Sequence, residues 1–209
     1  MEAVSSRGTE RAVQVLRSGG VVAFPTDTLY GLAADVFCTP AVERVFTIKE
    51  RPTGMPMPVL IASPDDLSKV AIEVPDIASE LAASFWPGPL TIILRRSPDV
   101  PDLVSGGRDT LGVRMPNHPV ALAMIEGFGG PVTGTSANIS GGADPSSWQE
   151  VEQALDGRVD YVVEEGPAPS GTASTVLDLT TKTPTLVRAG DLDISCIESL
   201  CNLSLVPAG

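Results

Sequence analysis

Histidine and cysteine are scarce in this 209-residue sequence, and their scarcity excludes several kinds of catalytic site. His118 is the single histidine and lies in a Pro-Asn-His-Pro turn, so it is a weak candidate for a Ser–His–Asp or Cys–His machinery. Cys38, Cys196 and Cys201 form neither a Cys-x-x-Cys pair nor a zinc-binding spacing. Their odd number predicts reduced thiols in a reducing compartment.

Positive charge is also limited. The chain carries 14 lysines and arginines against 26 aspartates and glutamates, which gives a formal net charge of −12. A surface with this balance repels nucleic acid on average, so any cluster of cations requires a local explanation. Apolar runs long enough to span a bilayer are absent, and the first residues lack a signal-peptide pattern. These absences predict a cytoplasmic protein without membrane contact.

Two common nucleotide-binding motifs are missing as well. The sequence contains no GxxxxGK[ST] and no GxGxxG after a strand, which argues against a P-loop or a Rossmann site. Aromatic residues make up 4% of the chain, so Val, Leu, Ile and Ala must form the core. The 20 glycines and 19 prolines are scattered, which predicts many turns rather than a fibrous or disordered chain.

Hydrophobic periodicity predicts alternating helices and strands, which is typical of the α/β class. Helices are expected at 7–18, 39–51, 63–70, 75–85, from 117 or 119 to about 126, at 147–155 and at 194–203. Strands are expected at 21–24, 32–36, 59–62, 90–95, 111–115, 131–134, 161–163, 175–179 and 185–187. The prediction is one domain, 1–209, with a twisted mixed sheet flanked by helices and an open crevice at the strand ends.

The stretch PTDTLYGL, residues 25–32, is the first sign of a site in that crevice. It follows the apolar run 21–24 and places hydroxyls and the Asp27 carboxylate at the mouth of a strand. Lys49 and Arg51 then bring two cations to the end of the next helix. Hydroxyls and cations at strand ends suit an anionic ligand, most simply a phosphate.

Further polar groups follow or end other strand-like runs: Arg114, Thr135-Ser136-Ala137-Asn138, Ser174-Thr175 and Arg188. Each has a structural explanation by itself. A Ser-Ala-Asn turn usually satisfies its own backbone, a strand-end arginine is usually solvated, and a Lys-x-Arg pair can complement a helix dipole. Their shared position at strand ends is what favours one common crevice.

Seven motifs occur in an order that resembles the YrdC/TsaC family: PTDTLYGL, KERP followed by PMPVLI, FWPGPLTIIL, GVRMP with HPVA, TSANISG, STVLDL and LVRAGD. They span about residues 21–191. The resemblance implies a nucleotidyltransferase, an L-threonylcarbamoyladenylate synthase. Such an enzyme makes threonylcarbamoyl-AMP and pyrophosphate from L-threonine, bicarbonate and ATP. The product is passed to a transferase that modifies an adenosine beside the tRNA anticodon.

The resemblance also implies a role for ten residues. Lys49 and Arg51 would bind phosphate and act in catalysis, and Ser136, Asn138 and Arg188 would complete the ATP site. The threonine and bicarbonate end would consist of Thr26, Thr28, Tyr30, Arg114 and Ser174. ATP is a substrate that would carry Mg²⁺ through its phosphates and water, so no dedicated metal site is expected and Asp27 is at most an indirect ligand.

Four positions depart from the pattern of the family. Glu50 stands where glycine is common, Met55 where a polar or basic residue often follows, Leu60 where many relatives have histidine, and Ala189 where proline is frequent. Two other functions remain open. One is a double-stranded RNA-binding module, against which the net charge argues and which leaves weak RNA contact as a secondary expectation. The other is a carbamoyl-adenylate-forming domain like those of hydrogenase maturation proteins.

Overall fold

The computed structural model describes residues 6–167, 169–201 and 205–207. Its helices are α1 (Arg7–Arg17), α2 (Thr39–Lys49), α3 (Leu67–Val70), α4 (Asp76–Phe85), α5 (Asp102–Ser105), α6 (Pro119–Phe128), α7 (Trp148–Leu155) and α8 (Ile194–Cys201), with a 3₁₀ turn η1 (Pro64–Asp66). Its strands are β1 (Val22–Pro25), β2 (Tyr30–Ala33), β3 (Val59–Leu60), β4 (Ala71–Ile72), β5 (Leu90–Arg96), β6 (Thr110–Arg114), β7 (Val132–Thr133), β8 (Thr135–Ser136), β9 (Tyr161–Val162), β10 (Thr175–Asp178), β11 (Thr185–Arg188) and β12 (Val206–Pro207).

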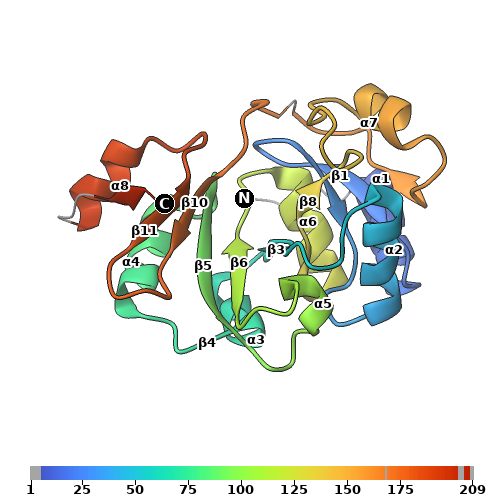
Figure 1. The fold of residues 1–209 in the computed structure, drawn as a ribbon. Helices are drawn as coiled ribbons and strands as arrows, with labels where there is room; N and C mark the ends of the chain where they lie inside the picture. Colours follow the sequence, from blue (N-terminus) through green and yellow to red (C-terminus); the bar gives the residue numbers. More distant parts are fainter. Residues whose placement is uncertain (1–5, 168, 202–204, 208–209) are drawn as a thin grey trace.

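The predicted α/β class is confirmed, and the described strands divide between two mixed sheets. The smaller sheet has the order β8-β2-β1-β9, and the larger has the order β12-β11-β10-β5-β6-β3-β7, with β4 paired to β5. Figure 1 shows α7 and α2 beside the smaller sheet and α4 and α8 beside β10 and β11. The site described below lies between the two sheets.

Gly134 is the point at which the chain passes from one sheet to the other. It separates β7, which pairs with β3, from β8, which pairs with β2. A Cβ at Gly134 would lie 2.5 Å from Leu60 Cγ, so a larger residue would have to displace the Leu60 side chain. The sequence predicted one strand at 131–134 and none at 135–136, and the structure corrects this, because a two-residue strand is too short to show a period.

Polar caps and an αL residue set the ends of the helices near the site. Ser6 accepts a hydrogen bond from the Thr9 amide at the start of α1, and Ser147 does the same for Glu150 at α7. Helix α2 was predicted to reach Arg51 but ends at Lys49, because Glu50 takes the left-handed conformation with φ 51°. The Lys49 side chain therefore belongs to the last turn of α2.

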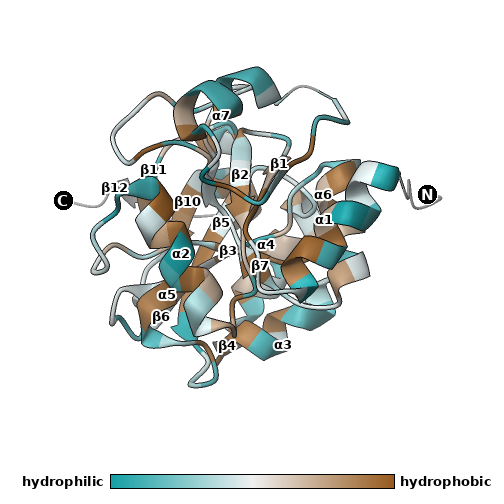
Figure 2. Ribbon diagram, turned by 90° about the vertical axis from the view of Figure 1, so that its right-hand side faces the viewer, coloured by the Kyte–Doolittle hydropathy of each residue, from teal (hydrophilic) through white to brown (hydrophobic). Residues whose placement is uncertain are grey.

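The hydrophobic residues form two clusters that cover both sheets. The larger cluster includes the strands β5, β6 and β10 and the inner faces of α2 and α4, while the smaller one lies under α1 and α6 around Phe24. Figure 2 shows the hydrophobic colour concentrated on the strands and on the inner sides of the helices. Among the described residues, none of the helices is both long and apolar enough to cross a membrane.

Other departures from the prediction concern short elements. Strand β2 runs 30–33 rather than 32–36, so Tyr30 is a strand residue, and β4, α5 and β12 were not predicted. The helix expected to open at Asn117 or Pro119 begins at Pro119, and it ends at Phe128 rather than near Glu126. The last helix ends at Cys201, and positions 202–203, where it was expected to continue, lie outside the described residues.

The left-handed Glu50 gives a prediction about stability. Glu50→Gly should be more stable than Glu50→Ala by roughly 1 kcal/mol, because both lose the Glu50–Arg158 ion pair but only glycine adopts positive φ without steric cost. Urea denaturation of the two variants and the wild type measures the difference. An alanine variant as stable as the glycine variant would contradict a strained cap.

Candidate active site

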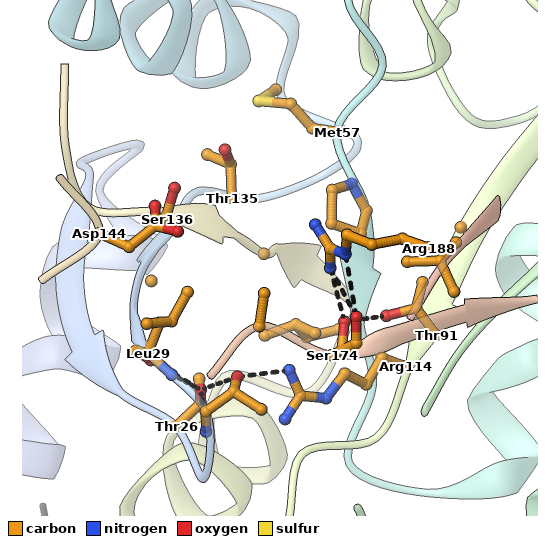
Figure 3. A pocket seen from close by; sticks show the side chains of 18 of the residues that line it. Thr26, Leu29, Met57, Thr91, Arg114, Thr135, Ser136, Asp144, Ser174 and Arg188 are labelled. Carbon is orange, nitrogen blue, oxygen red and sulfur yellow. Dashed lines mark hydrogen bonds between the residues drawn. The ribbon is translucent and has the colours of Figure 1, made fainter. Parts of the chain in front are cut away.

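A pocket of about 320 Å³ opens between the two sheets, at the ends of β2, β5, β6, β10 and β11 (Figure 3). Eight of the ten residues predicted for the site line it: Thr26, Thr28, Tyr30, Arg51, Arg114, Ser136, Ser174 and Arg188. Residues as far apart in sequence as Thr26 and Arg188 thus meet in one crevice, as the strand-end positions predicted. Lys49 and Asn138 are absent from its lining in the part of the chain that the structure describes.

The turn between β1 and β2 forms one wall. Thr26 Oγ1 donates to the Leu29 carbonyl at 2.7 Å and accepts from the amides of Thr28 and Leu29, both at 3.2 Å. The Thr26 hydroxyl is therefore engaged in holding its own turn. Thr28 Oγ1 lies 3.1 Å from Thr26 Oγ1 and accepts from Arg114, so the turn places Thr28 against the arginine.

Arg114 is the buried cation at this end of the pocket, with 6% of its surface exposed. Its Nε donates to the Gly88 carbonyl at 3.0 Å, Nη1 donates to Thr28 Oγ1 at 2.7 Å, and Nη2 donates to Asp27 Oδ1. Burial lowers the pKa of the guanidinium, and the Asp27 charge opposes that shift. A guanidinium has five N–H donors, so two remain for a ligand.

Arg188 and Ser174 form the opposite wall. Arg188 donates from Nε and Nη2 to the Ser174 carbonyl, at 3.0 and 2.8 Å, and from Nη2 to Ser174 Oγ at 3.1 Å. Ser174 Oγ lies 2.8 Å from Thr91 Oγ1, and Figure 3 shows these three side chains meeting. Thr91 was not predicted as a site residue. Its one signal in the sequence is a hydroxyl inside the otherwise apolar run 90–94.

Arg51 lies where the loop 52–58 crosses the pocket. Its Nη2 donates to the Pro56 carbonyl at 2.9 Å, while its buried Nε has no partner among the described residues. Burial lowers the pKa of this guanidinium. The segment 52–58, which lies between the helix expected at 39–51 and the strand expected at 59–62, contains no helix or strand. Met57, which is 1% exposed, lines the pocket, whereas Met55 faces outward.

Lys49 lies behind the pocket wall rather than in it, with 1% of its surface exposed. Its Nζ donates to the carbonyls of Ser136 and Asn138 and to Asn138 Oδ1, the last two at 2.8 and 3.0 Å. Burial lowers the pKa of Lys49 to about 8, helped by the Arg51 charge and opposed by Asp144. The structure thus places Lys49 and Asn138 outside the pocket lining, where both contact the lining residue Ser136.

Comparison with known proteins supplies the family. The sequence model of the Sua5/YciO/YrdC domain, described as telomere recombination, matches residues 14–190. The chain belongs to the Sua5/YciO/YrdC family. The resemblance seen in the seven motifs is therefore confirmed.

Several members of the family are closely similar. The chain is 43% identical over 189 residues to a protein from Pyrococcus abyssi named threonylcarbamoyl-AMP synthase, covering 90% of this chain and 56% of that protein. It is 40% identical over 191 residues to a protein of the same name from Bacillus subtilis, covering 91% and 55%. The crystal structure of P. abyssi Sua5 complexed with L-threonine superposes with a TM-score of 0.93 at 40% identity, covering 96% and 58%. The chain spans little more than half the length of these relatives.

Glu50, which the resemblance marked as a position where glycine is expected, takes the left-handed conformation that glycine adopts without steric cost. Its carboxylate accepts from Arg158 Nη1 at 2.6 Å, so it points away from the two cations that flank it in sequence. Leu60, another departure, lines the pocket and contributes apolar surface there. Asp144 is a lining carboxylate that the sequence did not single out.

Tyr30 and His118 form hydrogen bonds to backbone carbonyls near the site of this family member. The Tyr30 hydroxyl donates to the Val163 carbonyl at 3.2 Å, and burial, with the nearby Glu164 charge, raises the pKa of Tyr30 to about 12. His118 is 2% exposed, its Nε2 lies 3.1 Å from the Pro167 carbonyl, and it is not among the lining residues. Burial lowers the pKa of His118. Because His118 lies outside the pocket lining, it is not positioned to act as a base there.

The Asp27–Arg114 pair predicts a large loss of stability on removal of its negative member. Asp27→Asn should lower the free energy of unfolding by roughly 3 kcal/mol, because it leaves a buried guanidinium uncompensated. The control is Asp109→Asn, which breaks the exposed pair with Arg95 and should cost less than about 1 kcal/mol. Urea denaturation measures both, and equal losses would contradict the structural role of Asp27.

Proposed function

We propose that this chain is an L-threonylcarbamoyladenylate synthase. The observation that carries the proposal is the convergence of Arg51, Arg114 and Arg188 with the hydroxyls of Thr28 and Ser174 in one pocket. Relatives at 40–43% identity bear the name of this activity, and a similar structure is described as a complex with L-threonine. The site brings anions together without a covalent nucleophile, which is what this reaction requires.

ATP would occupy the side of the pocket lined by Arg51, Ser136 and Arg188. Both guanidinium groups keep N–H donors for phosphate oxygens, because Arg51 donates one hydrogen bond within the protein and Arg188 leaves the two N–H groups of Nη1 unused. Mg²⁺ would arrive with ATP and keep most of its water. The described residues hold no cluster of three or more metal-binding side chains, and the single lining carboxylate, Asp144, fits a metal held through water and phosphate.

L-Threonine would occupy the side of the pocket lined by Arg114. The two free N–H groups of Arg114 would take the amino-acid carboxylate, and Thr28 or Ser174 would meet the threonine hydroxyl. Thr26, whose hydroxyl is held within its own turn, and Tyr30, which is anchored to Val163, would shape the pocket rather than bind the ligand. Bicarbonate would lie between the amino acid and the α-phosphate.

The reaction would proceed in two bond-forming stages. The threonine amine and bicarbonate give a carbamate and water. A carbamate oxygen then attacks the α-phosphorus of ATP, the bond to the β-phosphate oxygen breaks, and pyrophosphate leaves. Orientation and neutralisation of the phosphate charge would supply the rate, since no group of the protein forms a bond with the substrates.

The product, threonylcarbamoyl-AMP, is a reactive mixed anhydride and would be passed to a tRNA threonylcarbamoyl transferase. Such a reaction, which uses ATP and serves tRNA modification, would take place in the cytoplasm. The relatives contain further residues outside the part that aligns with this chain. The proposal therefore concerns only the pocket described above.

Pyrophosphate release tests the proposal directly. With ATP and Mg²⁺ present, release should require both L-threonine and bicarbonate, and Arg51→Ala should reduce the rate by about 100-fold or more. Arg108→Ala is the matched control, because Arg108 is an exposed arginine outside the pocket and should keep the wild-type rate. Release that is independent of threonine would refute the proposed function.

Side-chain selectivity tests the placement of the amino acid. A pocket that hydrogen-bonds a hydroxyl rejects an analogue without one more strongly than an analogue without a methyl group, because a buried partner stays unpaired. Serine should therefore be a poor but detectable substrate, and valine a worse one. Arg114→Lys should raise the KM for threonine and leave ATP binding close to normal, since lysine cannot form the parallel hydrogen bonds.

Equal use of valine and threonine, measured as pyrophosphate release, would contradict a polar partner for the threonine hydroxyl. An Arg114→Lys variant that mainly weakens ATP binding would move the amino acid to another part of the pocket.

A further inference from the structure

The ammonium group of Lys49 has no donor left for a ligand. It carries three N–H groups, and the structure provides three oxygen acceptors: the carbonyls of Ser136 and Asn138 and the side-chain oxygen of Asn138. The backbone carbonyl of the same lysine accepts from the Ser140 amide at 2.8 Å. Lys49 is thus attached at four points to the segment 135–144, which consists of β8 and the loop that follows it and is called the loop 135–144 below.

Asn138 connects Lys49 by hydrogen bonds to two residues of the pocket surface. Its Oδ1 accepts from Lys49 Nζ and from Ser136 Oγ, the latter at 2.7 Å. Its Nδ2 donates to the Gly142 carbonyl at 2.8 Å and to Asp144 Oδ1 at 3.3 Å. Ser136 and Asp144 line the pocket, whereas Asn138, which is 5% exposed, does not. The buried pair therefore fixes two groups that a ligand would meet.

The orientation of the Ser136 hydroxyl depends on the same network. Because Ser136 Oγ donates its proton to Asn138 Oδ1, it presents lone pairs, and not a proton, to the pocket. Asp144 likewise presents acceptor oxygens there. This part of the wall suits a donor group of a ligand or a metal-bound water, and it does not suit a bare phosphate oxygen.

We propose that Lys49 is a positioning residue. Its ammonium orders the loop 135–144 so that Ser136 and Asp144 face the ligand, while Arg51 and Arg188 meet the phosphates. The identity of the ligand as a nucleotide rests on the proposed function. The attachment of Lys49 to the loop does not, since it follows from the contacts of the free protein.

A lysine suits this position better than other residues would. A compact ammonium can direct three donors to three separate oxygens, whereas a guanidinium is planar and a neutral side chain of the same length has no donor. The charged groups that face it are Arg51, at the start of the following loop, and Asp144 in the attached loop. Because the pKa of Lys49 is lowered to about 8, the ammonium that holds the loop is lost as the pH rises through that value.

Lys49→Met tests the proposal, with two measurements that do not depend on turnover. Amide hydrogen exchange at Ser140 and Gly142 should accelerate at least tenfold, because the loop loses its central anchor. The affinity for inorganic pyrophosphate, measured by calorimetry, should stay within about threefold of the wild type. Arg188→Ala is the control, and it should reverse the pattern, with normal loop exchange and pyrophosphate affinity reduced roughly tenfold or more.

Two outcomes would overturn the proposal. One is an unchanged exchange rate in the loop of Lys49→Met. The other is a loss of pyrophosphate affinity in Lys49→Met as large as that in Arg188→Ala, which would make Lys49 a phosphate ligand. Should the methionine variant fail to fold, Asn138→Ala removes the hydrogen bonds that Asn138 makes to Lys49, Ser136 and Asp144. It is expected to give the same faster loop exchange and the same unchanged pyrophosphate affinity.

The pH dependence of turnover is a further measurement, because a residue with a purely structural role would not affect it. The wild-type rate of pyrophosphate release should fall as the pH rises through about 8, and Lys49→Met should be slower but should lack this fall. A fall that persists in the variant would assign it to another group and count against the proposal. If wild-type protein released no pyrophosphate with threonine, the proposed function would fail, while loop exchange would still decide the role of Lys49.

Discussion

The burial of positive charge is the constraint on which the site depends. Lys49 and Arg114 are almost completely inaccessible to water, and an unsatisfied buried cation would cost several kcal/mol. The chain meets this cost by surrounding each cation with oxygen atoms from segments far away in sequence. Satisfying Lys49 fixes the loop 135–144, and satisfying Arg114 fixes the turn that carries Asp27 and Thr28. The walls of the pocket are consequences of that requirement.

The cations of the site thereby divide into two kinds. Arg51 and Arg188 are only partly covered and line the pocket directly, so their charge is available to an anionic ligand. Lys49 and Arg114 are buried, and Lys49 uses all three of its donors within the protein. Arg114 and Arg188 each use three of five donors within the protein, so these two arginines differ in exposure and not in the number of free donors. In a chain with a net charge of −12, attraction for phosphate is therefore a local property of a few oriented side chains. The acidic remainder of the surface also argues against the RNA-binding alternative.

The sequence was sufficient for the α/β class, the longer helices and the convergence of strand-end residues, because each of these follows from periodicity and position in the chain. It could not reveal that Lys49 and Asn138 lie behind the wall. Residue type shows which donors exist, but only the packed structure shows which are already used. Thr91 and Asp144 escaped notice for a related reason, since one lies within an apolar strand and the other in a loop whose path depends on Lys49. The division into two sheets at Gly134 likewise needs three-dimensional contacts.

A crystal structure of this chain with ATP, Mg²⁺ and L-threonine would test the account most directly. We predict that Arg51 and Arg188 lie within hydrogen-bonding distance of phosphate oxygens and that Arg114 holds the threonine carboxylate. We also predict that Lys49 Nζ keeps its three contacts with Ser136 and Asn138. A phosphate oxygen bound to Lys49 Nζ, with the loop 135–144 released, would contradict the account.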